Sequence, residues 1–209
     1  MTAPGTTTTG TATPYTGQQP HRRTVTDIAV AAELGDEALQ LLRSDDVRGG
    51  PREFLSILTK REMFPEAVRF LAFSLPKREC VWWAWVCARK ASGAKPEPPV
   101  KTALEATERW IIQPTDDHRR AAMESAQAAD VGTPAGCAAL AAFFTGGSLA
   151  PPNVPPVPPG EFMTAKAVTG SIMLSAVIVE PERAAEKFRE FLALGLEVAE
   201  RITLWPTSG

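Results

Sequence analysis

The most distinctive part of the sequence is the uncharged run Val81-Trp82-Trp83-Ala84-Trp85-Val86-Cys87-Ala88. It holds three of the five tryptophans of the chain, and charged residues flank it on both sides. Pro76 precedes the segment Lys77–Ala91, which predicts one continuous helix around this run. In a soluble protein, a helix that is apolar on all sides is a buried, central one. We therefore expect Lys77–Ala91 to form the middle of the core.

Apolar residues recur at helical spacing on both sides of this segment. Phe54 and Leu58 share one face of a segment that begins at Pro51, and Leu104 and Trp110 share a face further along. Strand signals are nearly absent from the sequence. The pattern predicts an all-α protein, an irregular multi-helix bundle of eight to nine helices. Stacked helical pairs are an alternative between residues 27 and 145, although no repeat of fixed period is present.

The chain divides into a tail and a single helical domain. Residues 1–25 are rich in Thr, Pro and Gly, cannot bury enough apolar surface to order themselves, and are expected to be disordered. Residues 26–145 form the main helical region, with Asp27 as the expected N-cap of its first helix. Residues 146–160 form a Pro-rich crossover loop. Residues 161–205 form a C-terminal helical pair, over 161–179 and 181–204, packed on the same domain. In the second of these helices, Ile202 is expected on the apolar face, and Gly195 is expected to permit a close helix contact.

The crossover loop has Pro at six of the nine positions 151–159. Neither a helix nor a central strand tolerates this density of proline, so polyproline II is the expected conformation. Two interpretations remain. The loop is a stiff spacer across the surface, which we favour because no Lys or Arg flanks it. The alternative is a docking motif for an aromatic groove of another protein.

Charge and hydropathy exclude several classes of protein. The chain has 22 basic and 24 acidic residues, so it lacks the basic excess typical of nucleic-acid binding. Its longest uncharged apolar stretch, residues 167–179, is shorter than the ~20 residues that a membrane span needs. The first 20 residues contain no basic or apolar run of the kind found in signal peptides. With only three cysteines, a cytoplasmic location is expected.

No motif identifies a catalytic, cofactor or metal site. The sequence contains no Gly-x-Ser-x-Gly, no phosphate-binding Gly-rich loop and no His-Glu-x-x-His. His118 lies beside Asp116 and Asp117, but these acids are expected to cap a helix, and no further ligand completes a metal site. We therefore predict no catalytic residue, no cofactor and no bound metal.

Four residues of Lys77–Ala91 fall on one stripe of the expected helix. Arg78, Trp82, Trp85 and Arg89 occupy positions i, i+4, i+7 and i+11, so two guanidinium groups bracket two indoles. Tryptophan and arginine are enriched at the centres of protein interfaces, which makes these four residues the candidate partner-binding site. The alternative is a core helix whose indoles are buried and whose arginines only reach solvent.

The same part of the chain resembles a known family. Leu75-Pro76-Lys77-Arg78-Glu79, followed by Val81-Trp82-Trp83-Ala84, is similar to a segment of bacterial helical proteins of about 200 residues that have no assigned function. The resemblance covers residues 50–90. It implies a helical bacterial protein and carries over no catalytic residue.

Two functions are compatible with these patterns. The first is a non-enzymatic adaptor or scaffold that binds another protein through the Arg/Trp stripe. The alternative is a ligand carrier or enzyme with a pocket lined by Trp82, Trp83 and Trp110. Its polar groups would come from Arg78, Glu79 or His118. The sequence favours the adaptor, because it carries no catalytic constellation.

Overall fold

The computed structural model describes residues 23–43 and 50–205, and within these ranges the protein is entirely helical. The α-helices are α1 (Val25–Ala31), α2 (Asp36–Arg43), α3 (Pro51–Lys60), α4 (Phe64–Ser74), α5 (Lys77–Ala91), α6 (Pro98–Ile112), α7 (Asp116–Ala128), α8 (Pro134–Phe143), α9 (Met163–Val177) and α10 (Ala184–Arg201), and a short 3-10 helix, η1, covers Pro181–Arg183. The all-α prediction is confirmed. Of the predicted disordered tail, residues 1–25, the part up to residue 22 lies outside the described residues, whereas Thr24 and Val25 belong to the start of α1.

The described ranges hold ten α-helices, so the predicted eight to nine is too few. Glu33, Glu62 and Asp130 follow α1, α3 and α7 with φ of 52°, 58° and 64°, and end each helix in the left-handed conformation. Glycine usually provides this conformation, so these helix ends carry no clear sequence signal. The predicted N-cap of the first helix, Asp27, was also wrong, because Thr24 is the N-cap of α1 and Asp27 completes its capping box.

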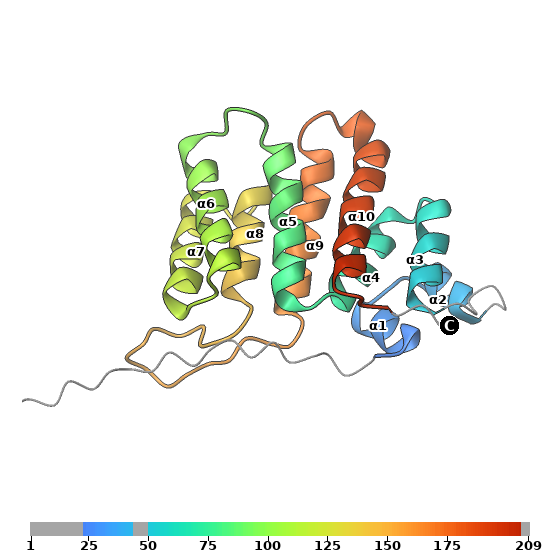
Figure 1. Cartoon of the computed structure of the whole chain (residues 1–209), viewed down its shortest axis with the longest axis horizontal. Coiled ribbons are helices and arrows are strands. Elements are labelled where there is room, and N and C mark those ends of the chain that lie inside the picture. Colours follow the sequence, from blue (N-terminus) through green and yellow to red (C-terminus); the bar gives the residue numbers. More distant parts are fainter. Residues whose placement is uncertain (1–22, 44–49, 206–209) are drawn as a thin grey trace, which may run out of the picture.

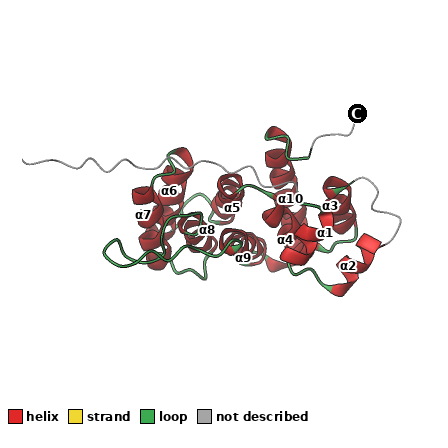
Figure 2. Ribbon diagram, turned by 90° about the horizontal axis from the view of Figure 1, so that it is seen from below, coloured by secondary structure: helices red, strands yellow, loops and turns green. Residues whose placement is uncertain are grey.

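Helix α5 lies at the centre of the row of helices in Figure 1. It packs on α8 and α9 on one side, and on α6 and α10 to its left and right. Seen from below in Figure 2, α8 and α9 lie beneath α5, while α6 and α10 flank it. One side of α5 therefore has no described helix packed over it.

This open side corrects the expectation that α5 is buried all round. Cys80, Val81, Trp83, Ala84, Cys87 and Ala88 are buried against the neighbouring helices. Trp82 and Trp85 are only partly buried. The bounds of α5 agree with the prediction, but its burial is one-sided because α6 and α10 flank the helix without covering it.

The last two helices differ in extent from the sequence prediction. Helix α9 starts at Met163 and ends at Val177, inside the predicted 161–179. Glu180 has φ of 48°, and the chain continues through η1 before α10. Gly195 of α10 allows the close contact that its position predicted. A Cβ there would lie 2.6 Å from both Leu71 Cδ2 and Trp83 Cε2.

Arg119 of α7 binds the first residues of the crossover loop through hydrogen bonds. This guanidinium group is almost fully buried and donates to Phe143 O at 2.9 Å and Ser148 O at 3.0 Å. It also bonds the Asp116 carboxylate at 2.8 Å and lies over the Phe143 ring. The loop itself closes through Leu149 N, which donates to Val157 O at 2.8 Å. Helix α7 thus positions the chain for its return to α9.

No single helix of the described ranges is long and apolar enough to cross a membrane. The bent pair Met163–Val177 and Pro181–Arg201, with 113° between its helices, passes that test of length and composition only when taken together.

Candidate functional site

The open side of α5 carries the four residues that the sequence singled out. Arg78, Trp82 and Trp85 are partly buried, and Arg89 is exposed. Together they form one stripe along α5, which runs between α6 and α10. The structure therefore keeps the predicted stripe together on a side of α5 that no other described helix covers. It also divides the two indoles between the neighbouring helices.

The three tryptophans of α5 differ in the hydrogen bonds that their indole N–H groups make. Trp83 Nε1 donates to Phe191 O of α10 at 2.7 Å, and Trp85 Nε1 donates to Leu104 O of α6 at 3.0 Å. Trp82 Nε1 donates to no acceptor among the described residues and is not among their fully buried polar atoms. Buried indole N–H groups usually find an acceptor. Of these three indoles, Trp82 is therefore the one whose N–H donor meets no acceptor among the described residues.

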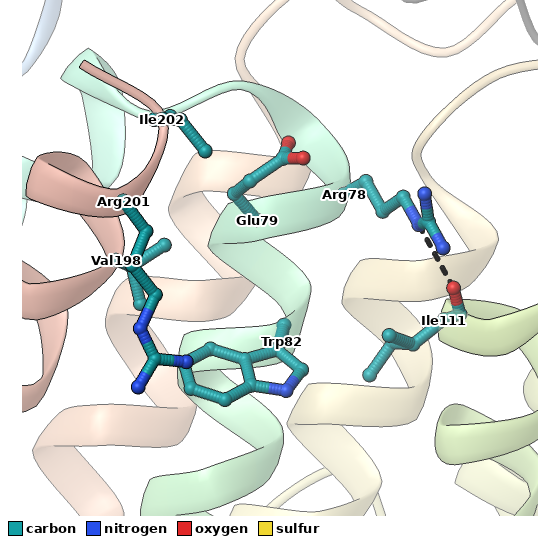
Figure 3. Close-up of a pocket in the computed structure, with 7 residues that line it drawn as sticks. All are labelled: Arg78, Glu79, Trp82, Ile111, Val198, Arg201 and Ile202. Atoms are coloured by element: carbon teal, nitrogen blue, oxygen red, sulfur yellow. Dashed lines mark hydrogen bonds between the residues drawn. The ribbon is translucent and has the colours of Figure 1, made fainter. Parts of the chain in front are cut away.

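Trp82 lies in an open groove of about 220 Å³ between α5, α10 and the end of α6 (Figure 3). The lining residues are Arg78, Glu79, Trp82, Ile111, Val198, Arg201 and Ile202. Its interior is mostly apolar, with the charged side chains on its flanks. In Figure 3 the Arg201 guanidinium lies beside the Trp82 indole, and the Glu79 carboxylate points to the opposite end of the groove.

Three arginines on this face have no carboxylate partner in the described ranges: Arg78, Arg89 and Arg201. Arg78 Nε donates to Ile111 O at 2.8 Å. The Arg89 guanidinium lies 5.2 Å from the centroid of the Trp85 ring, and that of Arg201 lies 6.0 Å from the Trp82 ring. The ring contacts hold Arg89 and Arg201 beside the indoles, and the Ile111 carbonyl holds Arg78, while most N–H donors of the three arginines meet no acceptor among the described residues.

Arg201 and Ile202 are the site residues that sequence reasoning missed. Arg201 lies in the last turn of α10, where a basic residue is ordinary because it complements the helix dipole. Nothing in the sequence indicates that the end of α10 lies beside the start of α5. Ile202, expected on the buried side of its helix, is 38% exposed.

The residues proposed for a tryptophan-lined pocket do not meet. Trp83 and Trp110 are buried at 0% and 2% exposure, and neither lines the groove that holds Trp82. His118 is also elsewhere, with its Nδ1 2.8 Å from Gln113 O. Only Arg78, Glu79 and Trp82 of that hypothesis share one site.

The described residues contain no cluster of three or more His, Cys, Asp or Glu that could hold a metal ion. Burial raises the pKa of the Cys80 and Cys87 thiols well above the usual range, which makes both poor nucleophiles. The groove places one carboxylate, Glu79, beside two guanidinium groups and an indole. A carboxylate, guanidinium groups and an indole can hold a ligand through ion pairs, hydrogen bonds and ring contacts.

A family model matches residues 54–199, which is most of the chain, and its description is a family of unknown function, DUF6931. The chain belongs to this family. The DUF6931 match begins within α3 and ends within α10. It includes α5 and the groove as far as Val198, whereas Arg201 and Ile202 follow it. No curated protein and no solved structure matches the chain.

Proposed function

We propose that this protein is a helical adaptor that binds another protein through the open side of α5. The observation that carries the proposal is Trp82, a partly exposed indole with an unused N–H donor in a mostly apolar groove between free arginines. Tryptophan and arginine dominate the binding energy of many protein interfaces. A large aromatic ring beside solvent also supplies contact area with little loss of side-chain entropy.

The shape of the groove favours a protein segment over a metabolite. Small-molecule sites are concave, of roughly 300–1,000 Å³, and bury most of the ligand. The groove at Trp82 is smaller, about 220 Å³, and open to solvent. An open groove of this size can seat one or two side chains of a partner while the rest of the stripe contacts the partner's backbone.

The rigidity of the surface also supports this role. Trp85 is held by its hydrogen bond to Leu104 O, and Arg78 by its bond to Ile111 O, so both side chains already have fixed positions. A surface that is organised before binding loses less conformational entropy when the partner arrives.

The test is affinity capture with the tagged full chain, in wild-type form and as Trp82→Ala, Arg201→Ala and Arg61→Ala. Arg61 is the matched control, because it is an exposed arginine without an ion pair in the turn between α3 and α4, away from α5. We expect a stoichiometric partner with wild type and Arg61→Ala, and its loss with Trp82→Ala while circular dichroism is unchanged. Equal recovery with all four proteins would assign binding to another surface and contradict the proposal.

A further inference from the structure

The charges around the groove indicate the chemistry of the partner, an inference that rests on the proposed function. Elsewhere on the described surface, several arginines pair with acids, such as Arg69 with Glu66, Arg120 with Asp116, and Arg183 with Glu180 and Glu186, while Arg61 stands alone. On the open side of α5, by contrast, Arg78, Arg89 and Arg201 have no carboxylate among the described residues. Three guanidinium groups that lack an acidic partner lie on one face, so a molecule that covers this face is expected to carry carboxylates.

The spacing of the arginines limits the length of that molecule. Arg78 and Arg89 are eleven positions apart on α5. At about 1.5 Å per residue, this is a rise of about 17 Å along the helix. An extended peptide covers about 3.3 Å per residue, so five or six residues bridge the two guanidinium groups. Trp82 and Trp85 lie between them.

We propose that the open side of α5 binds an acidic, extended segment of another protein. Two carboxylates five or six residues apart contact Arg78 or Arg201 at one end and Arg89 at the other. Apolar side chains between them pack on Trp82 and Trp85. Arginine donates two parallel hydrogen bonds to a carboxylate, a geometry that matches free guanidinium groups held against aromatic rings.

Nucleic acid is the other polyanion that arginine and tryptophan can bind, and the geometry favours it less. Single strands bind by stacking bases on aromatic faces. Here, guanidinium groups already lie over a face of Trp82 and a face of Trp85. The Glu79 carboxylate also lines the groove and would repel a phosphate chain. A peptide can instead donate its backbone N–H groups to Glu79.

The experiment is fluorescence anisotropy with labelled peptides and the full chain. The acidic probe is Glu-Ser-Leu-Ser-Leu-Ser-Glu, in which alternation places both Glu and both Leu side chains on one face of an extended strand. The comparison peptides replace both Glu with Gln or with Lys, and a ten-nucleotide oligothymidylate is the nucleic-acid probe. The proteins are wild type, the double variant Arg89→Ala with Arg201→Ala, and the control Arg61→Ala.

We expect the acidic peptide to bind wild type and Arg61→Ala at least about tenfold more tightly than the Gln peptide. The double variant should lose this preference, and added salt should weaken it. Equal binding of the Glu and Gln peptides, no binding of any peptide, or tighter arginine-dependent binding of the oligothymidylate would each overturn the inference. A captured partner lost with Trp82→Ala but retained by the double variant would overturn the acidic segment and leave the adaptor function standing.

Discussion

Arg119 and Arg201 both lie over aromatic rings, but in opposite surroundings. Arg119 lies 4.6 Å from the Phe143 centroid, and its side chain is 4% exposed. Its N–H groups bond Asp116, Phe143 O and Ser148 O. Arg201 lies 6.0 Å from the Trp82 centroid, on an exposed turn, with no carboxylate partner in the described ranges.

The difference shows that an arginine–aromatic contact has no fixed role. Around Arg119, two carbonyls and a carboxylate satisfy the buried charge, so the contact is structural and holds the crossover loop on α7. Around Arg201, the described residues leave the donors without an acceptor beside a groove, where we propose that they bind a partner. Hydrogen-bond satisfaction, rather than the ring contact, separates the two roles.

The largest expected effect comes from the same substitution at the two sites. Arg119→Met leaves Phe143 O without its side-chain donor and Ser148 O with only the longer bond from Arg120, and should lower the free energy of unfolding by about 3 kcal/mol. Arg201→Met removes an exposed group and should change it by less than about 0.5 kcal/mol. Urea denaturation measures both values. Equal losses at the two positions would remove the distinction drawn between them.

Gly147 tests how closely the loop fits around Arg119. Its φ is +64°, and a Cβ would lie 2.9 Å from both Arg119 Nη2 and Asp116 Oδ1. Gly147→Ala should therefore lower the free energy of unfolding by about 1–2 kcal/mol. The neighbouring Gly146 has open space for a Cβ, which makes Gly146→Ala the matched control. Similar thermal melting of the two variants would show that the loop yields at this point.

Acid should weaken the structural cluster. Burial alone would raise the pKa of Asp116, but hydrogen bonds and positive charge from Arg120 and Arg119 outweigh it, and the pKa is held below the usual value. A carboxyl whose pKa is lowered by folding stabilises the protein above its unfolded-state pKa, about 3.8, and this stabilisation is lost as the pH falls through the folded-state pKa.

We therefore expect Asp116→Asn to flatten the decrease in stability between about pH 5 and pH 2, measured by urea denaturation across that range. Asp117→Asn is the control, since no described residue donates a hydrogen bond to the Asp117 carboxylate. If Asp116→Asn and wild type lose stability in parallel, the arginine cluster is not responsible for the acid sensitivity.

The smallest expected effect concerns the indole at the binding groove. Trp82→Phe removes an N–H that bonds no described acceptor, so the free energy of unfolding should change by less than about 0.5 kcal/mol. Trp83→Phe removes a buried hydrogen bond to Phe191 O and should cost at least about 1 kcal/mol. Chemical denaturation of Trp82→Phe and Trp83→Phe measures both changes in the free energy of unfolding. Equal losses would show that the two sides of α5 contribute alike to stability.

Much of the fold was predictable because it depends on local patterns. The bounds of α5 follow from Pro76 before it and from the charged residues at both ends of the apolar run. The close approach of α10 at Gly195 also agrees with prediction. The ends of α1, α3 and α7 carry no comparable signal, because glutamate and aspartate take the left-handed position that a glycine would have marked.

The sequence by itself determined the all-helical fold class and the stripe of Arg78, Trp82, Trp85 and Arg89, since both follow from the spacing of residues along single helices. Only the tertiary structure decided which side of α5 stays open, that Trp82 is the indole with a free donor, and that Arg201 joins it across the groove. These features depend on contacts between residues more than one hundred positions apart, such as Trp83 with Phe191. No periodicity within a single helix carries that information, because packing sets the position of each helix relative to the next.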